Sequence, residues 1–374
     1  MAEHDIQMDD PDVNAGQTTE SGDNHSIYLA EESALQHLNV DYNDDADSAL
    51  GGMTTQTSTM SVNSSIYNYV EENGRTYHRY KNGKYLIPND EAEMDRLDLQ
   101  HQLWLYTLHN QLFTAPIESP KNILDFGTGT GIWAIEVASQ YPSSRVLGTD
   151  LSPIQPNLQV VPSMTHPWLV LMQTSVPPNC QFEVDDFDDE WNYSQTFDLI
   201  HGRTMVTCFK DPLAVITSAF NALSPGGYLE LQDMVIPLRC IDDSIDGTRI
   251  EEWANRTLAA SRAMGLCWQK SQYYSQYFEQ AGFVDVVEQH FQWPINRWAK
   301  GAHMKVLGSW FMEDMSRALY SVSVAALTRG AGMSRAEVNE LVDGARRELH
   351  DNSIHAYLPI VVVYGRKPDP AVIH

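Results

Sequence analysis

Three glycines at alternate positions follow a short apolar run in the first half of the chain. The run covers residues 123–126, and the glycines are Gly127, Gly129 and Gly131. An apolar segment of helical length, residues 132–141, comes directly after them. This order predicts a strand, a tight turn and a helix. Glycine is needed in such a turn because the backbone bends sharply and a ligand approaches where a Cβ would stand. The helix N-terminus beyond it offers unpaired N–H groups and the positive end of a dipole.

Two carboxylates accompany this turn. Asp125 stands two residues before the first glycine, and Asp150 closes the next β-like run, residues 145–150. The spacing G-x-G-x-G differs from the G-x-G-x-x-G of dinucleotide-binding turns. A carboxylate at a strand tip can accept both hydroxyls of a ribose, each bond contributing roughly 1.5–3 kcal/mol. The pattern favours an adenosine cofactor without a pyrophosphate, of which S-adenosylmethionine is the common one. The alternative is a glycine turn that only packs a helix on a strand.

The charge of the chain is concentrated near its beginning. The net charge is −26. Residues 1–65 contain thirteen Asp and Glu, and the first Lys or Arg of the chain is Arg75. This distribution gives no basic footprint for direct nucleic acid binding or for an anionic membrane. Residues 1–65 are also poor in large apolar side chains, so we expect a disordered acidic tail. Such a tail either solvates the protein or docks on a basic partner.

The cysteines and the apolar runs indicate in which cellular compartment the protein lies. The four cysteines lie far apart with no C-x-x-C pair, which argues against a zinc site or any disulfide framework, so no metal is predicted. The longest apolar run, residues 357–364, is far shorter than the ~20 residues of a membrane-spanning helix. The acidic N-terminus lacks an apolar signal region. These features predict an intracellular protein, cytoplasmic or nuclear.

Residues 66–115 are expected to form a hairpin and a helix that pack on the core. Asn82-Gly83 lies between the β-like runs 76–80 and 84–87, which predicts a hairpin turn. A helix capped by Asn89 or Asp90 should follow. Its apolar stripe would hold Met94, Leu97, His101, Leu105, Leu108 and Leu112.

Residues 116–368 alternate between strand and helix patterns. Strands are predicted at 122–126, 145–150, 180–184, 197–201 and 227–233, and helices at 131–141 and about 211–223. Further helices are expected at 242–266, 274–282, in an insertion at about 294–333, and after the capping box that begins at Ser334, with strands at 284–293 and 357–364. Alternation predicts a mostly parallel α/β sheet with helices on both faces. The strand at 357–364 is apolar throughout and should be central, with Pro359 marking a bulge.

Asp125, Asp150, Asp186 and His201 all fall at the carboxyl ends of the predicted strands. Ligands of open α/β sheets bind beyond those ends, so one topology explains all four placements.

Several motifs make the chain resemble the class I S-adenosylmethionine-dependent methyltransferases, and among them the fungal LaeA-like methyltransferases. They span about residues 70–368 and read ENGRTYH at 72–78, DRLD at 95–98, GIWAIEVA at 131–138, GTDLSPIQP at 148–156, FDLIHGR at 197–203, DGT at 246–248 and HAY at 355–357. The resemblance implies a Rossmann-like sheet of seven strands, one of them antiparallel near the end.

The resemblance also implies roles for individual residues. Asp125 would hold the amino group of the cofactor and Asp150 its ribose, while the turn with its neighbours would pass close to it. Asp186 would meet the adenine amino group, with Asp185 as the alternative by one register, and Phe187 would pack on the ring. The cofactor-binding set is therefore Asp125, Gly127, Thr128, Gly129, Gly131, Asp150, Leu151, Asp186 and Phe187.

The acceptor side is less constrained. His201 is a candidate general base, or else a structural or substrate-orienting histidine. Arg203 could bind a substrate carboxylate or pair with a core acid. Arg96 or Tyr85 could reach the carboxylate of the cofactor if the N-terminal helix lies over the site. The Trp- and Met-rich segment 296–330 would cover an apolar acceptor pocket or form core.

Three functions fit this sequence. The first is a methyltransferase that acts on a small molecule of fungal secondary metabolism. The second is a LaeA-like regulator of secondary metabolite genes, working with protein partners in the nucleus. The third is a cofactor-binding scaffold without turnover. The acidic tail, the absence of a Lys/Arg-rich nuclear signal and the aromatic segment favour the first.

Overall fold

A computed structural model describes residues 69–78, 86–156 and 176–370 of the 374-residue chain. The predicted acidic tail and the predicted Asn82-Gly83 turn lie outside these ranges. Within them, no helix has both the length and the apolar character needed to cross a membrane.

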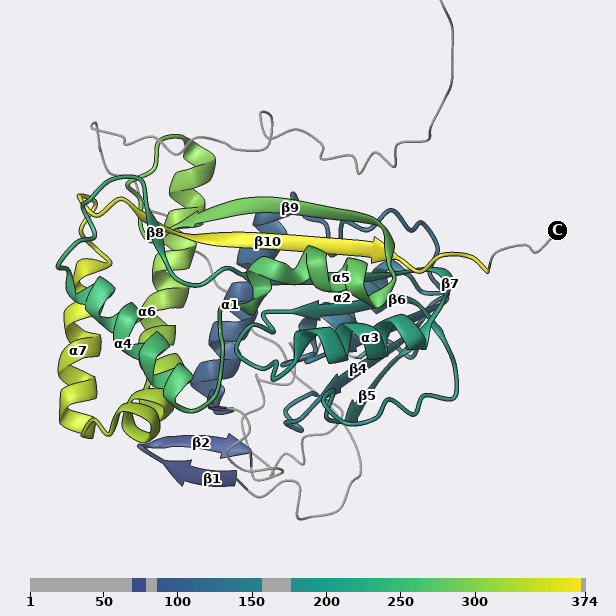
Figure 1. The fold of residues 1–374 in the computed structure, drawn as a ribbon, viewed down its shortest axis with the longest axis horizontal. Helices are drawn as coiled ribbons and strands as arrows, with labels where there is room; N and C mark the ends of the chain where they lie inside the picture. The colour runs from purple at the N-terminus through teal and green to yellow at the C-terminus, as the bar shows by residue number, and fades with distance from the viewer. Residues whose placement is uncertain (1–68, 79–85, 157–175, 371–374) are drawn as a thin grey trace, which may run out of the picture.

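One large sheet runs through the molecule in the order β5-β4-β3-β6-β7-β10 (Figure 1). Its strands are β3 (Asn122–Phe126), β4 (Arg145–Asp150), β5 (Cys180–Val184), β6 (Phe197–Arg203), β7 (Leu223–Met234), β8 (Arg239–Cys240), β9 (Val284–Pro294) and β10 (Ala356–Arg366). Strands β3 to β7 pair in parallel, whereas β10 runs antiparallel to β7, β8 and β9. The two-residue β8 pairs only with the start of β10. The prediction of a mostly parallel sheet with one antiparallel strand near its end is confirmed.

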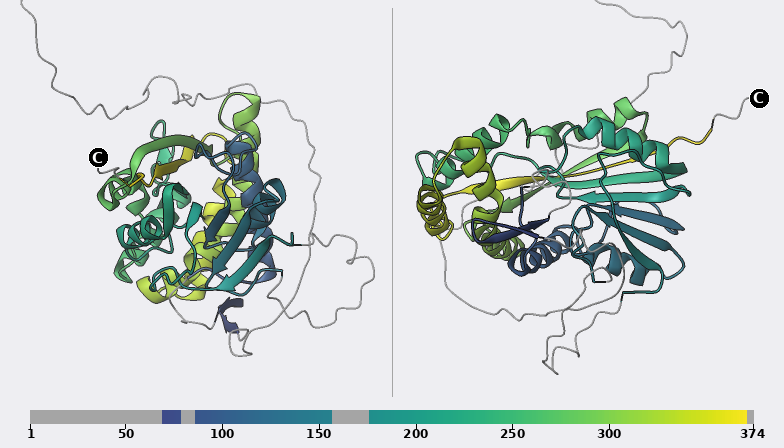
Figure 2. Two further views of the ribbon diagram at one scale, coloured as in Figure 1. Left: turned by 90° about the vertical axis from the view of Figure 1, so that its right-hand side faces the viewer. Right: turned by 90° about the horizontal axis from the view of Figure 1, so that it is seen from below.

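Helices cover both faces of this sheet (Figure 2). They are α1 (Glu91–Thr107), α2 (Ile132–Gln140), α3 (Pro212–Ala222), α4 (Arg249–Ala263), α5 (Tyr274–Ala281), α6 (Ala302–Ala331) and α7 (Arg335–Glu348), with the short 3₁₀ helix η2 at Lys270–Tyr273. On one face α3 and α5 pack over Phe126 and Ile200, and on the other α2 packs over Ile123 and Leu199. Helices α4, α6 and α7 stand together at the left of Figure 1.

The hairpin lies earlier than the sequence suggested. Strands β1 (Tyr69–Glu72) and β2 (Arg75–His78) pair across Asn73-Gly74, where both residues have positive φ. Asn-Gly turns at both places satisfy the same local rule, and the described arm of the predicted hairpin at Leu86 and Ile87 is not a strand. The prediction missed the turn at Asn73-Gly74, which carries a signal of the same type.

Helix α1 buries polar side chains beside apolar ones. Asp90 caps it as expected. Of the predicted stripe, His101, Leu108 and Leu112 are buried, whereas Met94, Leu97 and Leu105 are half-buried. The helix also buries Glu93, Arg96 and Gln100, which the sequence did not predict, because their partners on α6 satisfy the charges and periodicity alone cannot reveal them.

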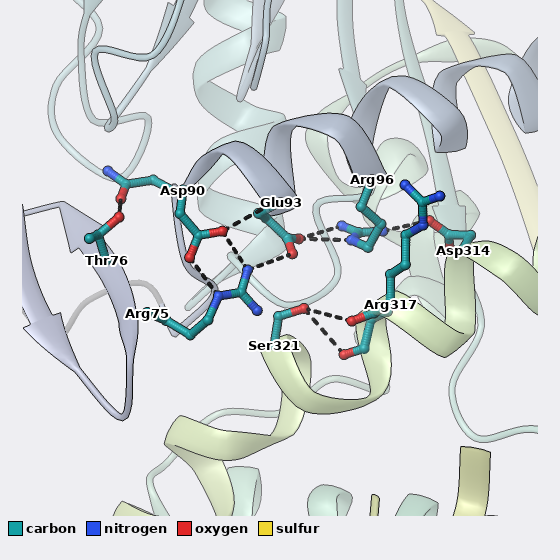
Figure 3. A network of polar contacts seen from close by, with 10 residues as sticks. Arg75, Thr76, Asp90, Glu93, Arg96, Asp314, Arg317 and Ser321 are labelled. Atoms are coloured by element: carbon teal, nitrogen blue, oxygen red, sulfur yellow. Dashed lines mark hydrogen bonds and ion pairs between the residues drawn. The ribbon is translucent and has the colours of Figure 1, made fainter. Parts of the chain in front are cut away.

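Figure 3 shows this buried polar face. The Arg96 guanidinium donates to Glu93 Oε1 and to Asp314 Oδ1 on α6, both at 2.8 Å, and all three side chains are at most 3% exposed. Arg75 of the hairpin donates to both oxygens of Asp90 at 2.5 and 2.6 Å. Removing one partner of a buried ion pair costs about 3–5 kcal/mol, so the Arg96–Asp314 contact fixes α1 against α6. The Arg75–Asp90 contact joins the hairpin to the start of α1.

Two other expectations are settled by packing. The helical insertion is core, because Leu307, Phe311 and Leu319 of α6 are buried in a cluster with Trp104 and Trp293. Strand β10 is central, as predicted. Its register shift lies between Tyr364 and Arg366 rather than at Pro359, whose carbonyl accepts from Val235 N–H at 2.8 Å.

Candidate active site

The glycine turn connects β3 to α2 as the sequence predicts. Gly127, Gly129 and Gly131 have φ of 66°, 56° and 83°, a region that other residues rarely adopt. A Cβ on Gly131 would lie 2.5 Å from the Phe182 ring, and one on Gly127 2.6 Å from Met205 Sδ. A Cβ on Gly129 would meet nothing closer than Leu97 Cδ1 at 3.6 Å. The outer two glycines therefore serve packing, while Gly129 lines the cavity and has room for a Cβ in ordinary contact with Leu97.

Asp150 ties this turn to the tip of β4. Its Oδ2 accepts from Gly129 N–H at 2.9 Å and its Oδ1 from Ser152 N–H at 2.8 Å. Burial raises the pKa of Asp150 to about 6, against these two hydrogen bonds, which lower it. The carboxylate is thus fixed in orientation beside the glycine turn, and the two sites that the sequence linked lie next to each other.

Gln155 supports the same turn from the other side. Its amide Nε2 donates to Gly129 O at 2.7 Å and to Ser152 O at 3.0 Å. The sequence reasoning assigned it no role, although the run DLSPIQP contains it. Leu151, the neighbour of Asp150, is half-buried.

Asp125 and His201 form a buried pair on adjacent strands. The two residues are register partners of β3 and β6, and His201 Nδ1 lies 2.7 Å from Asp125 Oδ1. Because a carboxylate only accepts, Nδ1 carries the proton. Asp125 Oδ2 accepts from Thr128 Oγ1 at 2.5 Å. The imidazole stacks on Trp133 with ring centres 3.7 Å apart, and His201 is fully buried.

The other nitrogen of His201, Nε2, has no hydrogen-bond partner among the described residues. A buried polar atom without a partner is costly, which makes it a natural place for a ligand or a water to bind.

Arg203 lies two residues beyond His201 on the same face of β6. Its Nη2 donates to His101 Nδ1 of α1 at 2.8 Å. Burial lowers the pKa of Arg203 to about 10, against the charges of Asp125 and Glu136, which raise it. Arg203 is charged at neutral pH and makes no direct ion pair with a core acid among the described contacts.

Asp186 and Phe187 follow β5 as predicted. The contacts described for them lie within the loop after β5 and against neighbouring aromatic side chains. Asp186 is buried, and its Oδ1 accepts from Asp188 N–H at 3.1 Å. The Phe187 ring packs 5.8 Å from Phe126 and 5.7 Å from Phe209. The alternative, Asp185, accepts from Tyr193 Oη at 3.1 Å.

Helix α1 covers the glycine turn. Thr130 Oγ1 donates to Asp98 Oδ1 at 2.7 Å, and Thr204 Oγ1 donates to Gln100 Oε1 at 3.3 Å. Arg96 cannot reach the site, because its guanidinium is held by Glu93 and Asp314. That part of the prediction is wrong, and Tyr85 lies outside the described residues.

A cavity of about 50 Å³ lies between α1, the turn and the tip of β6. Its lining is Leu97, Gln100, His101, Asp125, Gly127, Thr128, Gly129, Thr130, Ile132, Trp133, His201, Arg203 and Thr204. Asp125, His201 and Arg203 are brought together here, whereas Asp186 and Phe187 are not part of the lining. Sequence reasoning missed Leu97, Gln100 and His101 as site residues; the DRLD motif at 95–98 was the available signal.

A larger hollow of about 310 Å³ lies between α4 and α6 and is lined by Arg256, Ala259, Ala260, Gly330, Ala331 and Met333. It contains one charged side chain and no potential base or nucleophile, so the smaller cavity is the better reaction site.

Residues 98–289 match the family described as "Methyltransferase domain". The chain is 33% identical over 319 residues to methyltransferase pytC of Aspergillus terreus, covering 84% of this chain and 93% of that protein. It is 31% identical over 321 residues to protein-methionine methyltransferase laeA of Emericella nidulans, covering 85% of this chain and 81% of that protein. The chain belongs to the LaeA-like methyltransferases. It is an enzyme of the S-adenosylmethionine-dependent class, and it has a methyl acceptor.

Among solved structures, the chain is similar to phosphoethanolamine N-methyltransferase 2 of Haemonchus contortus in complex with S-adenosylmethionine. The TM-score is 0.41 at 17% identity, and the match covers 74% of this chain and 52% of that one.

The residues present fit the donor. A carboxylate held by hydrogen bonds at Asp150, the Gly129 backbone at the cavity wall and a His201 nitrogen without a partner among the described residues belong to β4, the turn after β3 and β6, which are neighbours in the sheet. Each offers a contact that a nucleoside with an amino acid tail can use.

A matched pair of glycine variants tests which glycine faces the ligand. Gly129→Ala places its methyl at the cavity wall beside Leu97, so we expect loss of S-adenosylhomocysteine affinity by at least about tenfold and destabilisation of only ~1–2 kcal/mol from the positive φ. Gly131→Ala drives its methyl into Phe182 and should destabilise by a further ~1–3 kcal/mol. Calorimetry and urea unfolding measure the two effects. Unchanged affinity in folded Gly129→Ala would contradict the assignment.

The raised pKa of Asp150 predicts a pH dependence at the ribose end. If Asp150 binds the ribose as the sequence predicts, its charged carboxylate would accept both hydroxyls, and protonation below about pH 6 would weaken that ability. Affinity for 5′-methylthioadenosine, which lacks the amino acid tail, should therefore weaken by about tenfold from pH 7.5 to pH 5. Asp150→Asn should bind more weakly with a flat profile over this range. An equal slope in the variant would assign the effect to another group.

Proposed function

We propose that this chain transfers a methyl group from S-adenosylmethionine to a small molecule of fungal secondary metabolism. One observation carries the proposal: the cavity at the strand tips is roofed by the chain's own helix α1, through Leu97, Gln100 and His101 and the Thr130–Asp98 hydrogen bond. A centre enclosed in this way suits a compact acceptor and excludes water from the reaction. The similarity to methyltransferase pytC over 93% of its length supports methyl transfer as the reaction.

In this proposal each end of the cofactor has its own residues. Asp150 accepts hydrogen bonds from the ribose hydroxyls. Asp125 accepts hydrogen bonds from the amino group through the carboxylate lone pairs that its contacts with Thr128 and His201 do not use. The backbone of Gly127, Thr128, Gly129, Gly131 and Leu151 passes beside it. Asp186 and Phe187 serve the adenine end through the loop after β5, although their described contacts lie within that loop and the core.

When bound, S-adenosylmethionine supplies a sulfonium-activated methyl group, which leaves by in-line displacement while the sulfur keeps the bonding electron pair. The protein contributes alignment, which is worth roughly 7–11 kcal/mol for well-oriented reactants. His201 Nε2 takes the proton that an acceptor hydroxyl or amine releases. Asp125 holds the opposite nitrogen and offsets the positive charge that then forms on the ring.

A second function, that of a regulator acting on protein partners, is favoured by the names of other relatives. The relative from Emericella nidulans is named a protein-methionine methyltransferase, and a relative from Cochliobolus heterostrophus, 33% identical over 314 residues, is named a secondary metabolism regulator. In that case the acceptor would be a protein side chain, and the acidic residues 1–65 would contribute to partner binding.

Transfer of label from methyl-tritiated S-adenosylmethionine in fungal extract separates these functions. We expect label in the small-molecule fraction, with equal yield from a variant lacking residues 1–65 and almost none from Asp150→Asn. Label confined to protein, or lost on removing residues 1–65, would favour the regulator. Donor binding without any transfer would favour a scaffold without turnover.

A substitution at His201 tests its role as base. Asn can donate one amide N–H to Asp125, as Nδ1 does, but it has no basic nitrogen. His201→Asn should lower kcat by roughly 10²- to 10⁴-fold while S-adenosylhomocysteine affinity stays within about threefold. Retained kcat, or an equal loss of binding, would show that His201 only supports the site.

A further inference from the structure

Arg203 is the one cation in the described lining of the reaction cavity, and no acid neutralises it directly. Of its described hydrogen bonds, the single side-chain partner is the Nδ1 of His101, which is an uncharged acceptor. Arg203 is a half-buried residue and lines the cavity. A charged fork held at the wall of a small polar cavity is a site for an anionic group, because Arg binds carboxylates through two parallel hydrogen bonds.

The position of Arg203 along the sheet indicates which carboxylate it meets. Strands β4, β3 and β6 are consecutive neighbours, and they carry Asp150, Asp125 and Arg203 at their carboxyl ends. Neighbouring strands lie about 4.8 Å apart, so Asp150 and Arg203 stand on strands roughly 9–10 Å apart. That span matches the reach from a ribose hydroxyl to the end of an attached amino acid tail.

We infer that Arg203 binds the α-carboxylate of the methionine portion of the cofactor, and that it is a cofactor residue rather than a substrate residue. The ribose then lies over β4, the amino group over β3 and the carboxylate over β6. This inference rests on the proposed function, since it concerns the same cofactor. It leaves the acceptor to approach His201 without a charged anchor at Arg203.

His101 is the positioning residue for this guanidinium. It is 1% exposed, and its Nδ1 accepts from Arg203, so its proton lies on Nε2, 3.1 Å from Glu136 Oε2. Burial and the Arg203 charge lower the pKa of His101, which keeps the ring neutral and able to accept. Because His101 comes from α1, the roof of the site also aims the arginine.

Three ligands tested by calorimetry on the full chain isolate the carboxylate contact. S-Adenosylhomocysteine carries the carboxylate, S-adenosyl-3-thiopropylamine is the same thioether without that group, and 5′-methylthioadenosine lacks the whole amino acid tail. We expect Arg203→Gln to weaken S-adenosylhomocysteine by roughly 10- to 100-fold and to change the other two by less than about threefold. Thr204→Val, an uncharged change in the same lining, should affect all three ligands equally and weakly.

The outcomes are distinct. If S-adenosylhomocysteine binds Arg203→Gln as tightly as the unaltered chain, and only the KM of a carboxylated acceptor rises, the inference is overturned in favour of substrate binding. An equal loss for all three ligands would show a structural role and overturns it as well. Failure of the unaltered chain to bind S-adenosylhomocysteine would instead overturn the proposed function.

Discussion

The hydrogen bond from Gly129 N–H to the Asp150 carboxylate is the constraint on which the site depends. It joins the turn after β3 to the tip of β4, and so fixes the two places where a nucleoside would be held. The bond depends on the positive φ of Gly129 and on the buried position of Asp150, and it opposes the rise that burial causes in the pKa of this carboxyl. Gln155 braces the same turn through the Gly129 carbonyl. Together these contacts make the turn rigid before any ligand arrives, which lowers the entropy cost of binding.

The second determinant is the helix that covers the turn. Helix α1 is held by the buried ion cluster of Arg96, Glu93 and Asp314 in its first half and by buried Leu103 and Trp104 in its second half. The cluster orients α1 so that Leu97, Gln100 and His101 face the strand tips. Polar burial of this kind contributes little net stability, but one arrangement satisfies all its charges, which favours a unique packing. In this protein that packing places His101 against Arg203.

Local rules predicted the sheet well and the long-range contacts poorly. Periodicity placed the strands at 122–126, 145–150 and 180–184 at their observed bounds, because buried parallel strands are short apolar runs with clear turn signals. The hairpin at Asn73-Gly74 was not predicted, although it offers the same turn chemistry as Asn82-Gly83, which lies outside the described residues. The sequence left two roles for the segment 296–330, a cover over the acceptor pocket or a part of the hydrophobic core. The burial of Phe311 and Leu319 in the core cluster decides for the second. Asp125, Asp150, His201 and Arg203 could be proposed from strand order alone, since parallel strands end at one edge.

The sequence by itself determined the family, the glycine turn and the two carboxylates that flank it, because these depend on contacts within one βαβ unit. Only the tertiary structure decided which groups complete the site. It brought His101 from α1 to Arg203, buried His201 between Asp125 and Trp133, and turned Phe187 into the core. Such pairings join residues far apart in the chain, and whether a buried charge is neutralised depends on the partner that folding brings to it.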